Sequence, residues 1–124
     1  TLFSYDTAVT SGPVRMWISV RPKPSEADYP VRRLRERGWA GSAGTGSIFV
    51  DEDGPGERGY ASRIRSVGSV RSEVVRSRPE ALLIVRVWES RASDAGWEEA
   101  GARCERRARV VADRMAEKLR WRAP

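Results

Sequence analysis

The sequence predicts an α+β fold, in which an antiparallel sheet of about five to six strands carries one short helix and a long C-terminal helix packed on the sheet. Several segments alternate apolar and polar residues with the period-two pattern of strands, and turn-forming sequences separate them. The end of the chain instead repeats apolar residues at the three- and four-residue spacing of a helix. Strands grouped in this way, with the long helix last, are typical of the α+β class. The length of 124 residues predicts a single domain spanning residues 1–124.

The N-terminal segment predicts a β-hairpin. Residues 2–10 are rich in aromatic and β-branched residues, and Ser11, Gly12 and Pro13 form a turn sequence after them. Residues 14–21 then alternate strictly, so one face of this second strand is expected to be buried. The apolar set is Val14, Met16, Ile18 and Val20, and the alternate set is Arg15, Trp17, Ser19 and Arg21.

The middle of the chain predicts the short helix and four further strands. Pro22 and Pro24 end the second strand, and Gly38 ends a helix expected over residues 29–37. A small-residue loop over residues 41–46 leads to a brief strand at 47–50. Residues 51–59 form a turn-rich connection.

Three strands are expected after that connection. Residues 60–67 and 68–77 alternate loosely and predict half-exposed strands. Residues 81–88 are apolar on both faces, which predicts the central strand of the sheet.

The last segment, residues 93–121, predicts the long helix. Its apolar residues trace one stripe, through which we expect it to dock on the sheet. The stripe consists of Trp97, Ala100, Cys104, Ala108, Val111, Met115 and Leu119.

The basic residues are almost all arginine. Of the 23 lysines and arginines, only Lys23 and Lys118 are lysine, the chain has no histidine, and its net charge is +6. Arginine offers a planar set of donors to phosphates and carboxylates. The lack of histidine removes the commonest general base and metal ligand. This composition favours a binding surface over an enzyme, although codon bias in a GC-rich genome explains an arginine excess equally well.

Two groups of residues are candidates for binding. Arg63, Arg65, Arg71 and Arg76 form a basic stripe on a predicted strand pair, which would contact the phosphates of a nucleic acid. The alternative is that these arginines keep exposed strand edges soluble. Trp17 and Trp39 are candidates for base stacking or for an interface, with burial against the long helix as their alternative.

Catalytic and metal-binding patterns are scarce. Cys104 lies on the apolar stripe with no histidine to activate it, so we expect a packed thiol without a chemical role. Glu73, Tyr5 and Tyr60 are polar candidates that no spacing selects. Asp51 and Asp53 begin like a calcium loop, but the glycine and the final glutamate of such a loop are misplaced. We therefore expect neither a metal nor a cofactor.

One segment has a family resemblance. Residues 72–87 (SEVVRSRPEALLIVRV), followed by a long C-terminal helix, resemble the late strands of the helix-grip hydrophobic-ligand proteins, which include polyketide cyclases. The resemblance covers one hairpin. It implies a small apolar ligand, or a cofactor-free cyclase-like activity, in a pocket between the sheet and the C-terminal helix.

These observations favour a non-enzymatic domain whose arginine-rich surface binds an anionic partner, either nucleic acid or an acidic protein. The alternatives are the small-ligand protein just described and a structural subunit of a homo-oligomer. We expect homo-oligomerisation in each case, because a short antiparallel sheet leaves edges. No apolar run is long enough to span a membrane, so we expect a soluble protein, with the cytoplasm slightly favoured. Because the chain begins at Thr1, we expect that an upstream segment was removed.

Overall fold

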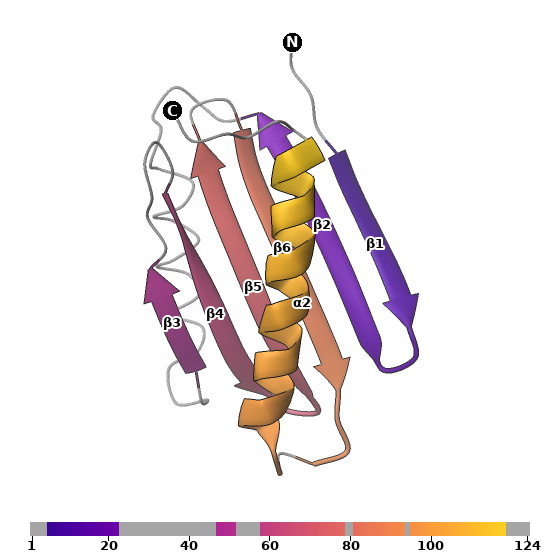
Figure 1. The fold of residues 1–124 in the computed structure, drawn as a ribbon. Helices are drawn as coiled ribbons and strands as arrows, with labels where there is room; N and C mark the ends of the chain where they lie inside the picture. Colours follow the sequence, from indigo (N-terminus) through magenta and orange to yellow (C-terminus); the bar gives the residue numbers. More distant parts are fainter. Residues whose placement is uncertain (1–4, 23–46, 52–57, 79–80, 94, 119–124) are drawn as a thin grey trace.

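The computed structural model describes residues 5–22, 47–51, 58–78, 81–93 and 95–118. In this part of the chain, strands form one twisted sheet and a long helix crosses one of its faces (Figure 1). The fold is therefore α+β, as predicted. The elements are β1 (Tyr5–Ser11), β2 (Val14–Pro22), β3 (Ser47–Asp51), β4 (Arg58–Ser66), β5 (Ser69–Arg78), β6 (Ala81–Ser90) and α2 (Trp97–Lys118).

The six strands lie in the order β1-β2-β6-β5-β4-β3, and every neighbouring pair is antiparallel. Tight turns join β1 to β2 and β4 to β5. Their glycines, Gly12 and Gly68, have φ angles of 57° and 78°, a region that residues with side chains rarely adopt. The pairing of β2 with β6 joins the N-terminal hairpin to the C-terminal strands. It also places β6 inside the sheet, which confirms that residues 81–88 lie in an inner strand.

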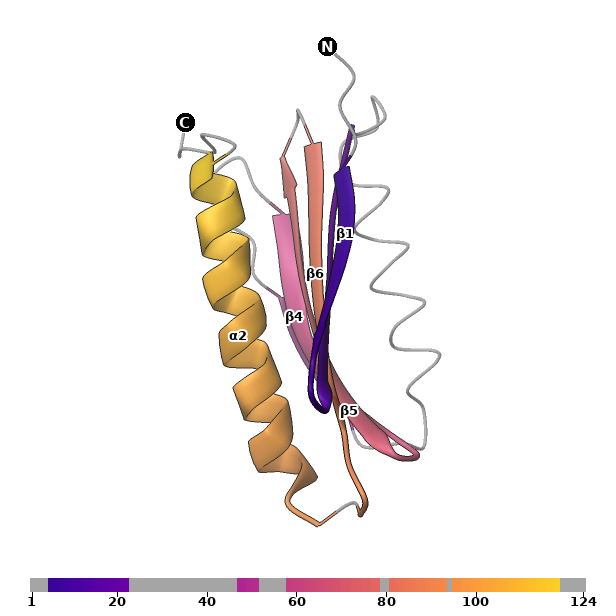
Figure 2. The same ribbon diagram turned by 90° about the vertical axis from the view of Figure 1, so that its right-hand side faces the viewer.

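The helix α2 packs on one face of the sheet, mainly against β4, β5 and β6, as the edge-on view in Figure 2 shows. Successive side chains of a strand point to opposite faces, so every second residue meets the helix. We call this face the helix-side face. Its core combines branched residues of the strands with small residues of the helix. The buried members are Val20, Ala61, Val70, Val74, Leu83, Val85, Val87, Ala100, Cys104, Ala108 and Ala112.

A long C-terminal helix is confirmed, but it begins at Trp97 rather than at residue 93, and its buried stripe is narrower than predicted. Val111 and Met115 are only half-buried, and Ala112 is fully buried instead. Residues spaced by four, from Ala100 to Ala112, form the contact because their small side chains let the helix approach the sheet closely. Leu119 lies outside the described residues.

A second, smaller apolar cluster lies on the opposite face of the sheet. Tyr60, Val75, Leu82 and Ile84 are buried there, and the half-buried Trp17 packs against them. The expectation that residues 60–67 and 68–77 are half-exposed strands is therefore wrong for most of their length. As inner strands, β4 and β5 are covered on both faces, and this burial includes polar residues.

The short helix predicted over residues 29–37 lies outside the described residues. Within the described ranges, no helix has the length and apolar character that crossing a membrane requires.

Candidate functional site

The pairing of β2 with β6 brings two tryptophans and two arginines together on the opposite face of the sheet. Arg15 lies directly across from Trp88, and Trp17 lies directly across from Arg86. Residues two apart on one strand share a face, so Arg15 also neighbours Trp17, and Arg86 also neighbours Trp88. Each aromatic ring therefore has an arginine beside it both along its own strand and across to the next.

The guanidinium groups lie over the indole rings. The central carbon of Arg86 is 4.7 Å from the ring centre of Trp17, and Arg21 lies at 5.8 Å from the same ring. Arg15 lies at 5.9 Å from the ring of Trp88. These distances fall within the range of cation–π attraction. We refer to Arg15, Trp17, Arg21, Arg86 and Trp88 as the Trp–Arg cluster.

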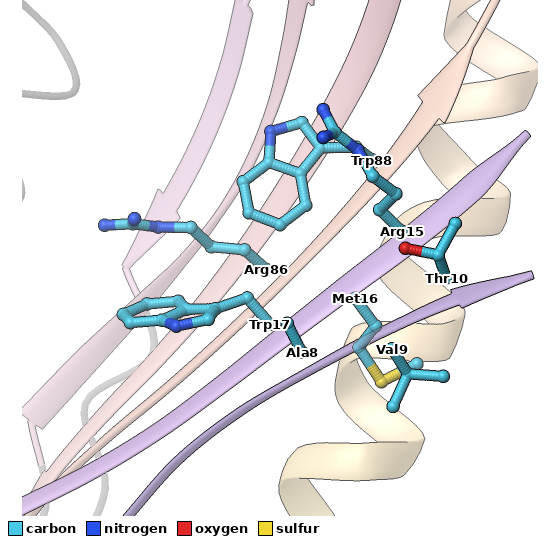
Figure 3. Close-up of a pocket in the computed structure, with 8 residues that line it drawn as sticks. All are labelled: Ala8, Val9, Thr10, Arg15, Met16, Trp17, Arg86 and Trp88. Atoms are coloured by element: carbon cyan, nitrogen blue, oxygen red, sulfur yellow. The ribbon is translucent and has the colours of Figure 1, made fainter.

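A depression of about 440 Å³ lies at the Trp–Arg cluster. Figure 3 shows the rings of Trp17 and Trp88 with the side chain of Arg86 between them. The indole rings and two guanidinium groups that line the depression lie on the face opposite the helix, whereas Val9 and Met16 belong to the helix-side face. The lining residues of the depression are Ala8, Val9, Thr10, Arg15, Met16, Trp17, Arg86 and Trp88.

A buried carboxylate holds one arginine of the cluster in place. Glu73 of β5 lies directly across from Arg86 and accepts hydrogen bonds from Nε of Arg86 and from the hydroxyl of Tyr60. Glu73 is 5% exposed and Tyr60 is 1% exposed. Burial, and then the charge of Glu73, raise the pKa of the Tyr60 hydroxyl, so it stays protonated as a donor. The two hydrogen bonds that link Tyr60, Glu73 and Arg86 therefore fix the orientation of Arg86 beside the depression.

The other two cations of the cluster are exposed. Arg15 and Arg21 have no carboxylate partner among the residues that the structure describes, and Nε of Arg21 donates a hydrogen bond to Ser19 Oγ at 2.9 Å. Arg71 of β5 lies across from Trp88 on its other side, and its Nε is buried without a hydrogen-bond partner. The positive charge of this face is therefore only partly compensated, by Glu73.

The structure does not bring the four arginines of the predicted basic stripe together. Arg63, Arg65 and Arg76 lie on the helix-side face, where each contacts a residue of α2, and only Arg71 lies on the face of the Trp–Arg cluster. Arg63 donates to Glu105 at 3.0 and 3.3 Å, Arg76 donates to Asp113 at 2.6 Å, and Arg65 lies 5.4 Å from the ring centre of Trp97. Trp39 lies outside the described residues.

These helix-side pairs contribute to the docking of α2. Burial by itself raises the pKa of the Glu105 carboxyl, but hydrogen bonds from Arg63 and Arg109 outweigh it and lower that pKa below its usual value. Glu105 is therefore ionised at neutral pH and binds both arginines.

Of the three polar candidates without a selecting pattern, Glu73 and Tyr60 are linked by a buried hydrogen bond, as described above. Tyr5 is instead the first residue of the edge strand β1. Cys104 is also buried. Burial, and then the charge of Glu89, raise the pKa of its thiol from 9.0 to about 11, so it carries little thiolate near neutral pH. No group of acidic or cysteine side chains suited to a metal ion occurs within the described ranges.

Sequence reasoning named Trp17 and Arg71 but missed Arg86 and Trp88 as partners of Trp17 and Arg15. Strand geometry by itself does place Arg86 and Trp88, two residues apart, on one face. The sequence does not show that β6 pairs with β2 as well as with β5, because no local pattern indicates a pairing between distant strands.

Comparisons with protein-family models, with curated proteins and with solved structures found no match for this chain. Its class therefore rests on its own fold and geometry: in the described part of the chain, an antiparallel sheet has α2 on one face and the tryptophan–arginine surface on the other.

Proposed function

We propose that this chain is a non-enzymatic binding domain that contacts an anionic partner through the Trp–Arg cluster. The observation that carries the proposal is the contrast between the two faces of the sheet. On the helix-side face, Arg63 and Arg76 are paired with acidic residues of α2. On the opposite face, Arg15 and Arg21 are exposed and have no acidic partner within the described ranges.

Unpaired arginines at a surface attract anions at long range and exchange their counterions for the partner's charges on contact. The cluster adds a fixed donor to this attraction, because Glu73 engages Nε of Arg86, and among the described residues no hydrogen bond occupies its two terminal nitrogens. The net charge of +6 acts in the same direction. A depression beside these cations provides a place where a ligand group is partly removed from water.

The test is the binding of inorganic polyphosphate, a polyanion without aromatic groups, to a variant carrying both Arg15→Gln and Arg21→Gln. Binding should weaken, and the slope of log affinity against log salt should flatten by about one unit for each arginine lost. The matched control carries Arg106→Gln and Arg107→Gln, two exposed arginines of α2, and loses the same total charge. It should retain the salt slope of the wild type.

Equal losses of polyphosphate affinity in the two double variants would mean that binding depends on net charge alone. That result would reject the cluster as the binding surface. The absence of polyanion binding at about 50 mM salt, where such contacts are strong, would reject the anionic partner altogether. Tight binding of an apolar probe with little salt dependence would instead favour the small-ligand alternative, whose site would then be the depression.

Homo-oligomerisation is the second part of the proposal. The edge strand β1 supports it, because Ala8, Val9 and Thr10 are exposed and the strand contains no lysine, arginine or proline. Edge strands that lack these residues readily pair with another chain.

A further inference from the structure

We infer that the anionic partner is single-stranded nucleic acid, with unpaired bases stacking at Trp17 and Trp88 and phosphates meeting the arginines beside them. The inference rests on the proposed function, since it names the partner of the same surface. Its basis is that the cluster contains two aromatic rings as well as cations. A partner with negative charge alone would use the arginines and leave both indole rings without a role.

The spacing of the cluster suits a ligand in which flat rings and charges alternate. Same-face residues are roughly 6.8 Å apart along a strand, and neighbouring strands are roughly 4.8 Å apart. Arg15 and Arg86 therefore each lie within one such step of both tryptophans. A nucleotide joins a flat base to a phosphate over a comparable distance, so one nucleotide reaches a ring and a guanidinium together.

The arginine side chains that lie over the indole rings do not prevent bases from stacking there. Arg15 and Arg21 are exposed and make no ion pair within the described part of the chain, so each is able to leave its ring and bind a phosphate. Arg86 is held by Glu73 and stays beside Trp17. Bases stack on guanidinium planes as well as on aromatic rings, so Arg86 extends the stacking surface.

The presence of two indole rings at the cluster favours a single strand over a duplex. In a duplex the bases are stacked on each other and cannot lie on indole rings, whereas unpaired bases are available for such contacts. Acidic protein segments lack the flat rings that two tryptophans accommodate. The cluster on the sheet thus combines the two features of single-strand binding surfaces, stacking rings and a positive path for the backbone.

The experiment compares four probes of matched charge: a single-stranded oligothymidine, a duplex of half that length, polyphosphate and polyglutamate. We expect the oligothymidine to bind best and to quench tryptophan fluorescence. Its log affinity should fall with log salt at about −0.7 per phosphate contacted. Trp88→Leu and Trp17→Leu should each weaken oligothymidine binding by about 5- to 150-fold, the loss expected for one stacked base. Both should leave polyphosphate binding unchanged.

Two controls separate stacking from folding. Trp17→Phe keeps an aromatic ring and should retain most of the oligothymidine affinity that Trp17→Leu loses. Trp97→Leu makes the same substitution on the helix-side face, where Arg65 lies over the ring, and should leave the affinity unchanged.

The outcomes distinguish this inference from the proposed function. If polyphosphate binds as tightly as the oligonucleotide and the tryptophan variants change neither, the anionic-partner proposal stands and the nucleic-acid inference is overturned. Preference for the duplex or for polyglutamate overturns the inference in favour of that partner. Failure of all four probes to bind overturns both.

Discussion

At the scale of the residue, the environment decides what each arginine does. Arg63 is part-buried and hydrogen-bonds Glu105 of the helix, so it stabilises the packing of two layers. Arg86 is held by the buried Glu73 and presents its remaining donors to a depression. Arg15 is exposed and lies over Trp88. The acidic groups within reach of each guanidinium group thus decide whether it is paired with the helix, held in place by a buried carboxylate or exposed.

Tyr60 carries the first stability prediction. The pKa of its hydroxyl is raised in the folded state above the 10.0 of an exposed tyrosine. The stabilising contribution of the neutral hydroxyl is therefore complete below pH 10 and is lost as pH rises through the folded-state pKa, because the unfolded chain then releases the proton first. We expect the melting temperature to fall above about pH 10 and to fall less steeply in Tyr60→Phe.

At neutral pH, Tyr60→Phe should cost about 1–3 kcal/mol, because the buried Glu73 loses a donor. Ultraviolet titration of the folded wild type should find one of the three tyrosines that ionises only when the protein unfolds. Ionisation of every tyrosine in the folded protein near pH 10 would contradict the burial of this hydroxyl.

At the scale of the element, helix α2 docks through small residues rather than through a ridge of large ones. Ala100, Ala108 and Ala112 are fully buried, whereas the larger Val110 is half-exposed. Because these side chains are small, the helix lies close to the strands beneath it. The ion pairs Arg63–Glu105, Arg76–Asp113 and Arg103–Glu89 connect the helix to β4, β5 and β6 in turn. Close apolar contact and a border of ion pairs together keep the helix in place.

Substitution by alanine should change the stability of the fold in opposite directions at two glycines, one in β4 and one in α2. A Cβ at Gly59 of β4 would lie 2.2 Å from the backbone oxygen of Val75, so the paired strands must move apart. A Cβ at Gly101 of α2 would lie 3.4 Å from Val70 Cγ2 and 3.5 Å from Arg63 Cβ, which the side chains accommodate. We expect Gly59→Ala to destabilise the fold by about 1–3 kcal/mol. Gly101→Ala should stabilise it by up to about 1 kcal/mol through helix propensity.

Denaturant unfolding of the two glycine variants measures both effects, with each serving as the control for the other. Equal destabilisation by both would show that the helix lies closer to the sheet at Gly101 than the structure places it.

At the scale of the whole molecule, the sheet separates the contacts that hold α2 from the proposed binding surface. Its helix-side face holds the larger apolar core and the ion pairs of α2. Its opposite face holds the smaller core around Tyr60 and, beside it, the Trp–Arg cluster with the depression. The inner strands β4, β5 and β6 contribute to both faces, and the alternation of their side chains directs each residue to one of them.

This separation predicts that stability and binding can be changed independently. Arg63→Gln leaves the part-buried Glu105 with a poorer partner and should lower stability by about 1.5–3 kcal/mol without weakening polyanion binding. The double variant Arg15→Gln, Arg21→Gln should change stability by no more than about 1 kcal/mol, because it removes exposed cation–π contacts and one part-buried hydrogen bond to Ser19, yet it should weaken binding. Thermal melts and polyanion titrations of both variants check this. A loss of both properties in either one would contradict the division between the faces.

Much of the fold could be predicted from local patterns. The alternation of Val14, Met16, Ile18 and Val20 identifies a strand with one buried face, and the turn residues beside it identify a hairpin. The long helix follows from its three- and four-residue spacing. The candidate site could be predicted only in part: Trp17 with Arg15 and Arg21 was visible on one strand, while Arg86 and Trp88 were visible on another as an unrelated alternation. Their juxtaposition depends on long-range pairing, which local periodicity does not contain.

By itself, the sequence determined the α+β class, the strands and long helix that the structure describes, and the arginine-rich, histidine-free chemistry of the chain. These properties depend on residue type and on spacings within a single segment. Only the tertiary structure decided which arginines are paired and which are exposed. The predicted stripe was divided because Arg63, Arg65 and Arg76 point to the helix while Arg71 points away from it. The physical reason is that side chains alternate across a sheet, so the covering of each face and the register between distant strands, not proximity in sequence, determine which charges meet.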